Sequence, residues 1–356
     1  MLKGIQKLIS FITPVFYQNK NSFIYKRAIE LIAKFQNHPK IELIIADSSK
    51  TPQLQAQAQN IKIIHTKQKQ QHFSLSQARN QAACHATKKY LLFFDVDMGY
   101  ADKFETLLFK EIESQLDTGQ LHFFQIPFLY LTQKGTYIFE NTHCLKLFKE
   151  SFLKGELNLV ESISITNPSI VISKQYFEKI GGFDEDFYGH GCEDYMLLHK
   201  LAAYNPHSKR NSNYYTDFKA RFIKDYSGFR EYFAPYALPY FFKDLILLHR
   251  WHPRPFYNRF YSRRVQNESL LQSKIRLFDQ AHKGKIWLSD IPAMNLSEYV
   301  TNLMLAHHYN LKEYPGFFSY AKGINLPKKS INNKIRKLFT RPKDFFKDIK
   351  FLKNKK

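Results

Sequence analysis

Short apolar runs alternate with longer amphipathic segments along the first third of the chain. The apolar runs predict strands at residues 8–12, 41–46, 61–64 and 90–94, the first stopping at Pro14. Helical spacing of apolar positions predicts helices over residues 21–37 and 74–88. Strands that are apolar on both faces and alternate with helices indicate an α/β fold, with a mostly parallel sheet covered on both sides.

The pattern is looser beyond about residue 120. Two further strands are predicted over residues 121–131 and 168–173. Residues 174–180 and 193–203 are predicted to be helical, the second more firmly than the first. The chain contains no internal repeat and no low-complexity linker that would separate this half from the first.

Acidic residues follow two of the predicted strands. Asp47 ends the run at 41–46, and Asp95-Val96-Asp97 follows the run at 90–94. Ligands of parallel sheets bind beyond the carboxyl ends of the strands. Two carboxylates at i and i+2 can share a divalent cation and a ribose there, and oxygen ligands point to Mg²⁺ or Mn²⁺. An ordinary acidic turn would give the same triplet, so the triplet alone leaves both interpretations open.

A glycine-rich segment leads into the predicted helix at 193–203, which opens with Glu193-Asp194. Its glycines, at positions 181, 182, 189 and 191, would let the backbone approach a flat, polar sugar closely. A carboxylate in the first turn of a helix should stay ionised with the help of the helix dipole, as a general base must be at neutral pH. Acidic capping of a helix is the alternative interpretation of this motif.

Taken in order, these segments resemble the family 2 glycosyltransferases of the GT-A fold. The matching segments, over roughly residues 8–270, are Thr13-Pro14-Val15-Phe16-Tyr17, Asp47-Ser48-Ser49, Ala78-Arg79-Asn80, Asp95-Val96-Asp97 and residues 180–201. The last segment is similar to the galactosyltransferase-type acceptor region, which bacterial capsule-polysaccharide transferases also contain. The resemblance implies a nucleotide-sugar-binding half over residues 1–120, an acceptor-binding and catalytic half over 121–285, and a helical, basic extension over 286–356.

The resemblance also implies roles for single residues on the donor side. Asp47 would contact the uracil, Arg79 the base or diphosphate, and Asp95 the ribose. Pro14 belongs to the same nucleotide-sugar-binding set, and Asp97 would bind the metal, Mn²⁺ or Mg²⁺.

A further metal ligand is expected beyond the Glu-Asp motif. His249 and His252 have the spacing of the pair that supplies it in galactosyltransferase-type enzymes, and imidazole suits Mn²⁺ better than Mg²⁺. The sequence does not choose between these two histidines. Asn267-Glu268 looks similar to an Asn-Glu pair that follows in those enzymes.

On the acceptor side, the resemblance makes Asp194 the base that deprotonates the acceptor hydroxyl. The implied acceptor-binding residues are Glu193, Gly191 and His190. His190 departs from the family pattern, which usually has an aromatic residue at this position, so the sugar specificity is not implied.

The activity implied is inverting transfer of a hexose or N-acetylhexosamine from a UDP-sugar to a glycan or lipid-linked glycan, in capsule or other surface polysaccharide synthesis. Inversion is expected because a base on the acceptor implies direct displacement of the diphosphate. A retaining transferase or a nucleotidylyltransferase using the same acidic triplet is the alternative.

The net charge of +22 favours an anionic partner. A nucleic-acid-binding protein would share this charge, but the sequence has no zinc-finger or aromatic RNA-binding signature, so we expect no nucleic acid. The charge is concentrated late in the chain, with 16 Lys and Arg against 6 Asp and Glu over residues 207–285. The three cysteines lack CxxC spacing, which indicates a reducing, cytoplasmic environment.

The last 35 residues, from Lys322, hold 13 Lys and Arg and 2 Asp. Apolar residues recur there at helical spacing, in two sets: Ile331, Ile335, Leu338 and Phe339, then Phe345, Phe346, Ile349 and Leu352. Basic amphipathic segments of this kind bind anionic membrane surfaces. We therefore expect a peripheral protein at the inner face of the plasma membrane, and a solvated tail is the alternative.

Overall fold

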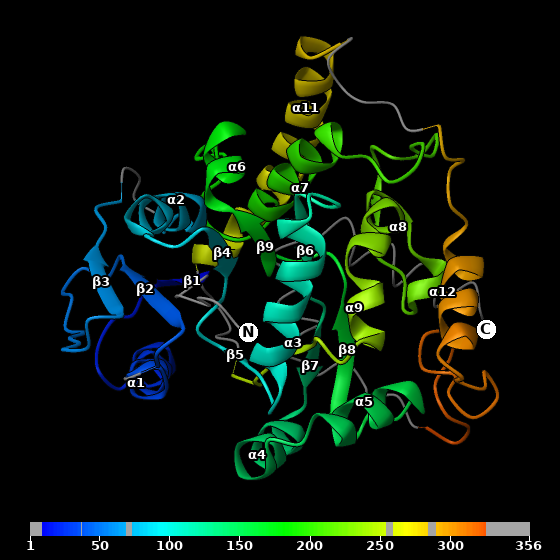
Figure 1. Ribbon diagram of the computed structural model, residues 1–356, viewed down its shortest axis with the longest axis horizontal. Helices are drawn as coiled ribbons and strands as arrows, with labels where there is room; N and C mark the ends of the chain where they lie inside the picture. The colour runs from blue at the N-terminus through cyan, green and yellow to red at the C-terminus, as the bar shows by residue number, and fades with distance from the viewer. Residues whose placement is uncertain (1–8, 37, 69–72, 254–258, 284–289, 325–356) are drawn as a thin grey trace.

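The structure is a computed structural model that describes residues 9–36, 38–68, 73–253, 259–283 and 290–324. A six-stranded sheet flanked by helices forms its core (Figure 1). In spatial order the strands are β3 (Ile61–His65), β2 (Ile41–Asp47), β1 (Ile9–Val15), β4 (Tyr90–Phe93), β9 (Ile170–Ser173) and β6 (Phe123–Gln125). Strands β1 to β4 are parallel, and β9 is antiparallel to both of its neighbours. The predicted α/β class with a mostly parallel sheet is confirmed.

Strand β1 continues through Pro14 to Val15, so the prediction that it stops at the proline is wrong. The Ile12 carbonyl accepts a hydrogen bond from Phe94, and pairing with β4 ends at Ile12. Backbone groups alternate in direction along a strand, so the Pro14 nitrogen faces this same side, beyond the end of the pairing. The missing N–H of Pro14 therefore costs the sheet no hydrogen bond.

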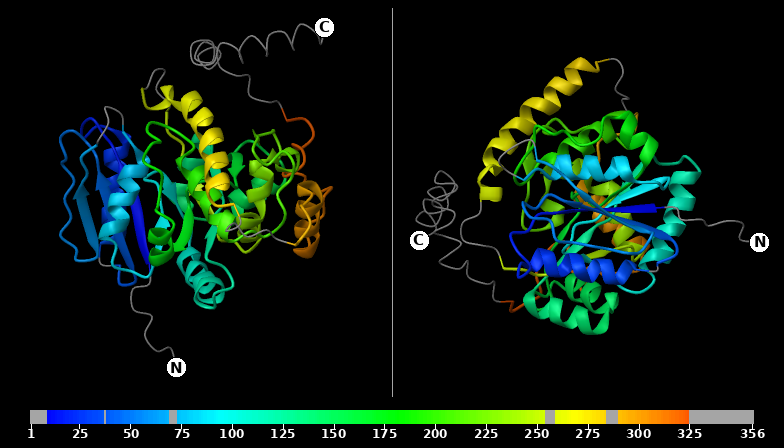
Figure 2. Two further views of the ribbon diagram at one scale, coloured as in Figure 1. Left: turned by 90° about the horizontal axis from the view of Figure 1, so that it is seen from above. Right: turned by 90° about the vertical axis from the view of Figure 1, so that its left-hand side faces the viewer.

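Helices cover both faces of this sheet, as the turned view in Figure 2 shows for α1 and α2. Helix α1 (Phe23–Phe35) packs with α3 (Phe104–Glu111) on one face, against inward-facing residues such as Phe11. Helices α2 (Leu75–His85) and α7 (Glu193–Tyr204) pack on the other face, against residues such as Ile12. Because both α2 and α7 lie on one face, their ends can meet at the edge where the strands end.

A second sheet has four strands. In spatial order they are β5 (Met98–Gly99), β12 (Leu247–His249), β7 (Phe128–Leu131) and β8 (Val160–Ser164). The single strand predicted over residues 121–131 is wrong, because β6 and β7 belong to different sheets. Ile126 N donates to Ser169 on the side of β9, whereas the Pro127 carbonyl accepts from Leu247 of β12. The chain changes sheet between these two residues.

The remaining elements cover the second sheet and the acceptor half. They are α4 (Gln133–Thr142), α5 (Leu145–Leu153), α6 (Lys174–Lys179), β10 (Asp217–Phe218), β11 (Ser227–Gly228), α8 (Phe229–Phe233), α9 (Leu238–Phe242), α10 (Arg259–Ser262), α11 (Arg264–Ala281) and α12 (Leu296–Ala306), with a π-helical turn (Ile112–Asp117) and 3₁₀ turns (Ile223–Asp225 and Ala234–Tyr236). Within the described ranges, no helix is both long and apolar enough to cross a membrane.

The C-terminal extension is helical at α12, as expected, and packs into the core of the second sheet. Val300 and Met304 of α12 are fully buried there, together with Phe317 of the following loop. That loop approaches α5 so closely that a Cβ atom at Gly316 would collide with the Phe152 carbonyl oxygen. The two amphipathic segments predicted in the tail fall in residues 325–356, outside the described residues.

Candidate active site

The acidic triplet lies where β4 ends, and the second sheet brings two histidines to it. Strand β5 follows Asp97 directly and pairs antiparallel with β12, with Met98 opposite His249. The Nε2 atoms of His249 and His252 lie 3.1 and 3.4 Å from the same Oδ2 atom of Asp97. These ligand atoms all lie within 4.8 Å of one another. The structure therefore brings together Asp97 and both candidate histidines.

This cluster fits a divalent cation. Burial alone would raise the pKa of Asp97, but His249 and His252 outweigh it and hold this pKa well below its usual range. The His252 ring stacks on Phe23 at 4.6 Å, and the His249 ring packs against Tyr130 at 4.7 Å. One carboxylate and two imidazoles held in place by aromatic rings are a donor set that suits Mn²⁺.

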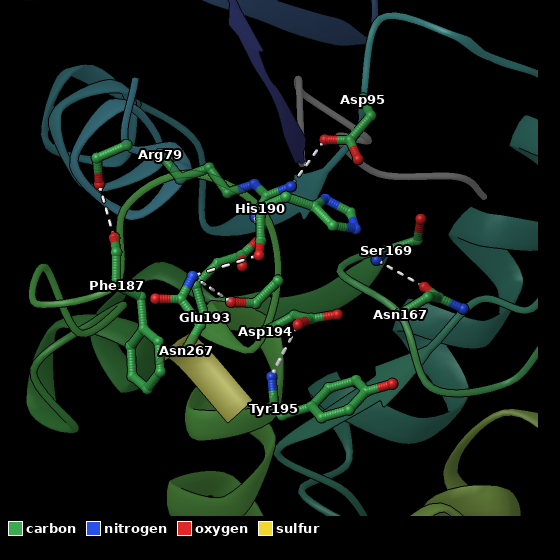
Figure 3. Close-up of polar contacts among 12 residues, drawn as sticks. Arg79, Asp95, Asn167, Ser169, Phe187, His190, Glu193, Asp194, Tyr195 and Asn267 are labelled. Atoms are coloured by element: carbon green, nitrogen blue, oxygen red, sulfur yellow. Dashed lines mark hydrogen bonds and ion pairs between the residues drawn. The ribbon is translucent and has the colours of Figure 1, made fainter. Parts of the chain in front are cut away.

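Arg79 connects the acidic triplet to the Glu-Asp motif (Figure 3). Its Nη2 atom lies 2.8 Å from Asp95, and its Nη1 atom lies 3.0 Å from Glu193. The side chain of Arg79 is fully buried. Burial would lower the pKa of its guanidinium, but the charges of Asp95 and Glu193 outweigh burial and raise it. One buried cation thus fixes two carboxylates that are separated by almost a hundred residues.

Glu193 and Asp194 form the first turn of α7, as the sequence predicts, and their burial there opposes the ionisation that the helix dipole favours. Burial raises the pKa of Asp194 to about 8, with a further contribution from the Glu193 carboxylate, against the opposing effect of Arg79. Burial also raises the pKa of Glu193. A single guanidinium does not compensate three clustered carboxylates, and desolvation exceeds the helix dipole effect. The raised pKa makes Asp194 a stronger base once it is deprotonated.

The segment before α7 is held by residues to which the sequence analysis assigned no role. The Asn80 amide donates to the Phe183 carbonyl at 2.9 Å and accepts from the Phe183 N–H at 2.9 Å. Ser74 Oγ donates to the Phe187 carbonyl at 3.0 Å. Asn267 Nδ2 lies 3.0 Å from the Gly191 carbonyl. The sequence signal was available, since Asn80 follows Arg79 and stands in the motif that carries the family resemblance.

Asp47 and Pro14 lie at the same edge of the sheet, on the neighbouring strands. Val15 of β1 pairs with Asp47 of β2, so Asp47 is two strand spacings, about 10 Å, from β4. Asp47 is buried and accepts hydrogen bonds from the Tyr17 hydroxyl at 2.7 Å and the Ser49 N–H at 2.9 Å. Burial raises the pKa of Tyr17 to about 12, so its hydroxyl stays a donor to Asp47. The implied uracil contact of Asp47 stays a prediction.

His190 and Gly191 lie in the loop that precedes Glu193, on the acceptor side. The His190 ring is half-buried and lies 4.9 Å from the Tyr261 ring of α10. Figure 3 shows His190 drawn with the Arg79–Asp95 pair and the Glu193-Asp194 carboxylates. Among the predicted site residues, two groups are in contact, Arg79 with Asp95 and Glu193, and Asp97 with His249 and His252. The acidic triplet contributes to both groups.

The fold and this arrangement of carboxylates at the strand ends define a glycosyltransferase of the GT-A fold. The chain belongs to the glycosyltransferase-like family 2, whose model matches residues 10–276. None of the curated proteins compared with the sequence matches it.

Among solved structures, the chain is similar to S. aureus TarS. The TarS 1–349 structure in complex with UDP is 17% identical, with a TM-score of 0.35, and the match covers 55% of each chain. The TarS 1–349 structure in complex with UDP-GlcNAc is 14% identical, with a TM-score of 0.31, over 55% of this chain and 53% of that one. A longer TarS chain matches over 33% of its length at 17% identity and a TM-score of 0.35. The chain thus matches about half or less of these proteins.

Proposed function

We propose that the chain is an inverting, metal-dependent glycosyltransferase that moves a hexose or N-acetylhexosamine from a UDP-sugar to a glycan hydroxyl. The observation that carries this proposal is the Arg79 bridge. It places the acidic triplet, which suits a nucleotide diphosphate, and the Glu-Asp motif, which suits a sugar hydroxyl, around one guanidinium.

On the donor side, Asp95 binds the ribose and Asp47 the uracil, as the family resemblance implies. Asp97, His249 and His252 would hold Mn²⁺ or Mg²⁺, which supplies neutralisation of the charge that develops on the departing diphosphate. Both histidines are assigned to the metal, because both Nε2 atoms face the same oxygen of Asp97. Arg79 holds the Asp95 carboxylate in position to bind the ribose. The contact of Arg79 with the base or diphosphate, which the family resemblance implies, is a second role.

On the acceptor side, Asp194 takes the proton from the attacking hydroxyl. The acceptor oxygen forms a bond to the anomeric carbon while the bond from that carbon to the diphosphate oxygen breaks, and UDP leaves with the electron pair. Attack opposite the leaving group inverts the anomeric configuration. Glu193, held by Arg79, together with Gly191 and His190 orients the acceptor sugar.

A screen of nucleotide-sugars tests this proposal. The protein is incubated with UDP-, GDP-, dTDP- and CMP-sugars, with and without Mn²⁺, and release of the free nucleotide is measured. We expect UDP release from at least one UDP-hexose or UDP-N-acetylhexosamine, stimulated by Mn²⁺. Equal turnover in excess chelator would contradict the metal requirement, and the absence of turnover with every donor would contradict the activity.

The anomeric configuration of the product separates the inverting mechanism from the alternatives. A donor with an α linkage should give a β product, read from the anomeric proton coupling in NMR spectra. Retention of configuration would favour the retaining transferase. Release of pyrophosphate from a nucleoside triphosphate would favour the nucleotidylyltransferase.

We further propose that the acceptor belongs to a capsule or another surface polysaccharide, and that the protein acts at the inner face of the plasma membrane. The support is the galactosyltransferase-type segment for the acceptor and the basic residues after Lys322 for the membrane. Co-sedimentation with phosphatidylglycerol vesicles, compared with phosphatidylcholine vesicles, tests the membrane part. Equal binding to the two would contradict an electrostatic contact.

A further inference from the structure

The second histidine of the metal cluster lies beyond the end of its strand. Strand β12 ends at His249, which pairs with Met98 of β5 and Tyr130 of β7. His252 follows three residues later, in a segment that belongs to no helix or strand. Both histidines nevertheless direct their Nε2 atoms at the same oxygen of Asp97. The sheet fixes the position of His249, so other contacts must fix that of His252.

Arg27 of α1 binds the backbone between the two histidines. Its Nη2 atom donates to the Trp251 carbonyl at 2.7 Å, and its Nη1 atom donates to the Arg250 carbonyl at 3.4 Å. The Arg27 residue is only 8% exposed. A guanidinium is a planar fork whose donors keep a fixed geometry, so two bonds from one fork fix the relative positions of two consecutive carbonyls. Arg27 therefore fixes the path of the chain from His249 to His252.

Two other side chains on the same face of α1 contact this segment. The Phe23 ring stacks on the His252 ring, with 4.6 Å between the centroids and 13° between the planes, and the Arg27 guanidinium lies 5.4 Å from the same Phe23 ring. The Glu30 carboxylate accepts a hydrogen bond from Arg250 Nη1 at 2.6 Å. Phe23, Arg27 and Glu30 are four and three residues apart, which places them on one side of the helix. One face of α1 thus contacts each residue from Arg250 to His252.

The N–H groups of the same segment bind to other elements. The Arg250 N–H donates to the Asp97 carbonyl at 2.9 Å, and its Nη2 atom donates to the Val96 carbonyl at 3.2 Å. The Trp251 N–H donates to Thr136 Oγ1 of α4 at 2.7 Å. The segment is therefore held through its N–H groups by the acidic triplet and α4, and through its carbonyls by Arg27.

We propose that Arg27 is a positioning residue of the metal site, which places His252 so that both imidazoles can bind one cation together with Asp97, and that it thereby gives the site a preference for Mn²⁺ over Mg²⁺. The inference rests on the proposed function, since it takes the cluster around Asp97 as the metal site. Imidazole nitrogen suits Mn²⁺ better than Mg²⁺, so a site that loses one imidazole loses affinity mainly for Mn²⁺. Groups that orient metal ligands are worth about 10–100-fold in metal affinity.

The charge of Arg27 and its hydrogen bonds have opposite effects on a bound cation. Burial lowers the pKa of Arg27 and the Asp97 carboxylate opposes this effect, so the charges of the two groups interact. Removal of a nearby positive charge would by itself strengthen the binding of a cation to Asp97. Loss of the two bonds to the Arg250 and Trp251 carbonyls would release His252 and weaken it. A fall in Mn²⁺ affinity on neutralising Arg27 therefore identifies the positioning role.

The test is a titration of the metal-free protein with Mn²⁺, without donor or acceptor, in which the EPR signal of free Mn²⁺ is measured. Competition by Mg²⁺ gives the affinity for that ion. Arg27→Gln should raise the Kd for Mn²⁺ by about 10–100-fold and should not weaken the binding of Mg²⁺. Arg27→Lys keeps the charge but cannot supply the planar fork, so it should recover only part of the Mn²⁺ affinity. Lys26→Gln, at the exposed preceding position of α1, is the matched control and should bind both ions like wild type.

A double variant shows whether Arg27 acts through His252. Arg27→Gln should cause no further loss of Mn²⁺ affinity in a His252→Ala background, because the imidazole that it positions is already absent. Additive losses, or equal losses of Mn²⁺ and Mg²⁺ affinity, would show a general structural role and overturn the inference.

Calorimetry of the metal-free variants verifies that they fold, and Arg27→Lys decides the question if Arg27→Gln does not. An unchanged Mn²⁺ affinity in a folded Arg27 variant would overturn the inference and leave the proposed function intact. A wild-type protein that binds no Mn²⁺ would overturn both the inference and the metal requirement. Failure of donor turnover with the expected Mn²⁺ affinities would reject only the transferase activity.

Discussion

Asp194 is the residue on which the proposed chemistry depends most directly. Burial raises its pKa to about 8, close to neutral pH, where a general base is most effective. The cause is the burial of Asp194 beside the Glu193 carboxylate, so the surrounding fold raises the pKa of the proposed base. A helix terminus alone would have produced a weaker, fully ionised carboxylate.

Asp194→Asn should lower kcat by about 10²–10⁴-fold, because the amide keeps the shape of the side chain but cannot accept the proton. In wild type, kcat/KM for the acceptor should rise with pH up to about 8, as the raised pKa of Asp194 is passed. The variant should lose this rise while binding the donor normally. Steady-state kinetics between pH 5.5 and 9 and donor titration measure both effects.

Glu193→Gln is the matched control for the pH profile. The Glu193 carboxylate raises the pKa of Asp194, so its removal should move the rising limb of kcat/KM to lower pH. The acceptor KM should increase at least as much as kcat falls, because Glu193 is assigned to the acceptor. A pH limb that persists unchanged in Asp194→Asn would assign the base to another group.

Asp97→Ala should reduce transfer by about 100-fold or more, since the charge of the departing diphosphate would lose its neutralisation. It should also abolish the rise in melting temperature that Mn²⁺ produces in wild type, which calorimetry measures without turnover. His249→Ala and His252→Ala, compared in the same assay, determine how the two imidazoles share the metal. An undiminished Mn²⁺ effect in Asp97→Ala would place the cation elsewhere.

At the scale of elements, the sequence predicted strands β1 to β4 and helices α1 and α2 because their apolar patterns are regular, but it missed α3. Two further errors involve prolines. Pro14 was read as a strand end, although its nitrogen faces a side where pairing has already stopped. Pro127 was missed as the point where the chain changes sheet, because the apolar run continues on both sides of it. Local patterns do not reveal which neighbour a strand will have.

The candidate site shows the same limit. Asp95, Asp97, Glu193 and Asp194 could be located from motifs, since each follows or opens a recognisable element. The ion pairs of Arg79 with Asp95 and Glu193 could not be predicted, because no local signal encodes a contact between α2 and α7. The raised pKa of Asp194 could not be predicted either, since it depends on burial by the whole fold.

The contact between α2 and the loop before α7 yields a prediction for Asn80. Asn80→Ala should lower kcat/KM for the acceptor roughly tenfold and leave the donor KM unchanged, because the hydrogen bonds to Phe183 that orient this loop are lost. Gln81→Ala, one residue further on the same helix, is the control. A loss of donor affinity in Asn80→Ala equal to the loss for acceptor would show that the residue supports the sheet rather than the loop.

At the scale of the whole molecule, the described extension is part of the catalytic body. The loop after α12 packs against the end of α5. Gly316 N donates to the Leu153 carbonyl at 2.7 Å, and Ala321 N donates to the Gly155 carbonyl at 3.1 Å. Phe317 is fully buried in the same core as β7 and β8. The folded body therefore extends at least to Ala321.

Truncation after Ile324 should accordingly separate membrane binding from folding. The removed residues, 325–356, hold 12 Lys and Arg against 2 Asp, and each cation near an anionic surface contributes about 1 kcal/mol. The truncated protein should keep its melting temperature and donor turnover but lose co-sedimentation with phosphatidylglycerol vesicles. Truncation after His308, which also removes Gly316 and Phe317, should instead lower the melting temperature, because a buried aromatic side chain and its backbone contacts are lost. Undiminished vesicle binding after the first truncation would move the membrane contact to the basic stretch over residues 207–285.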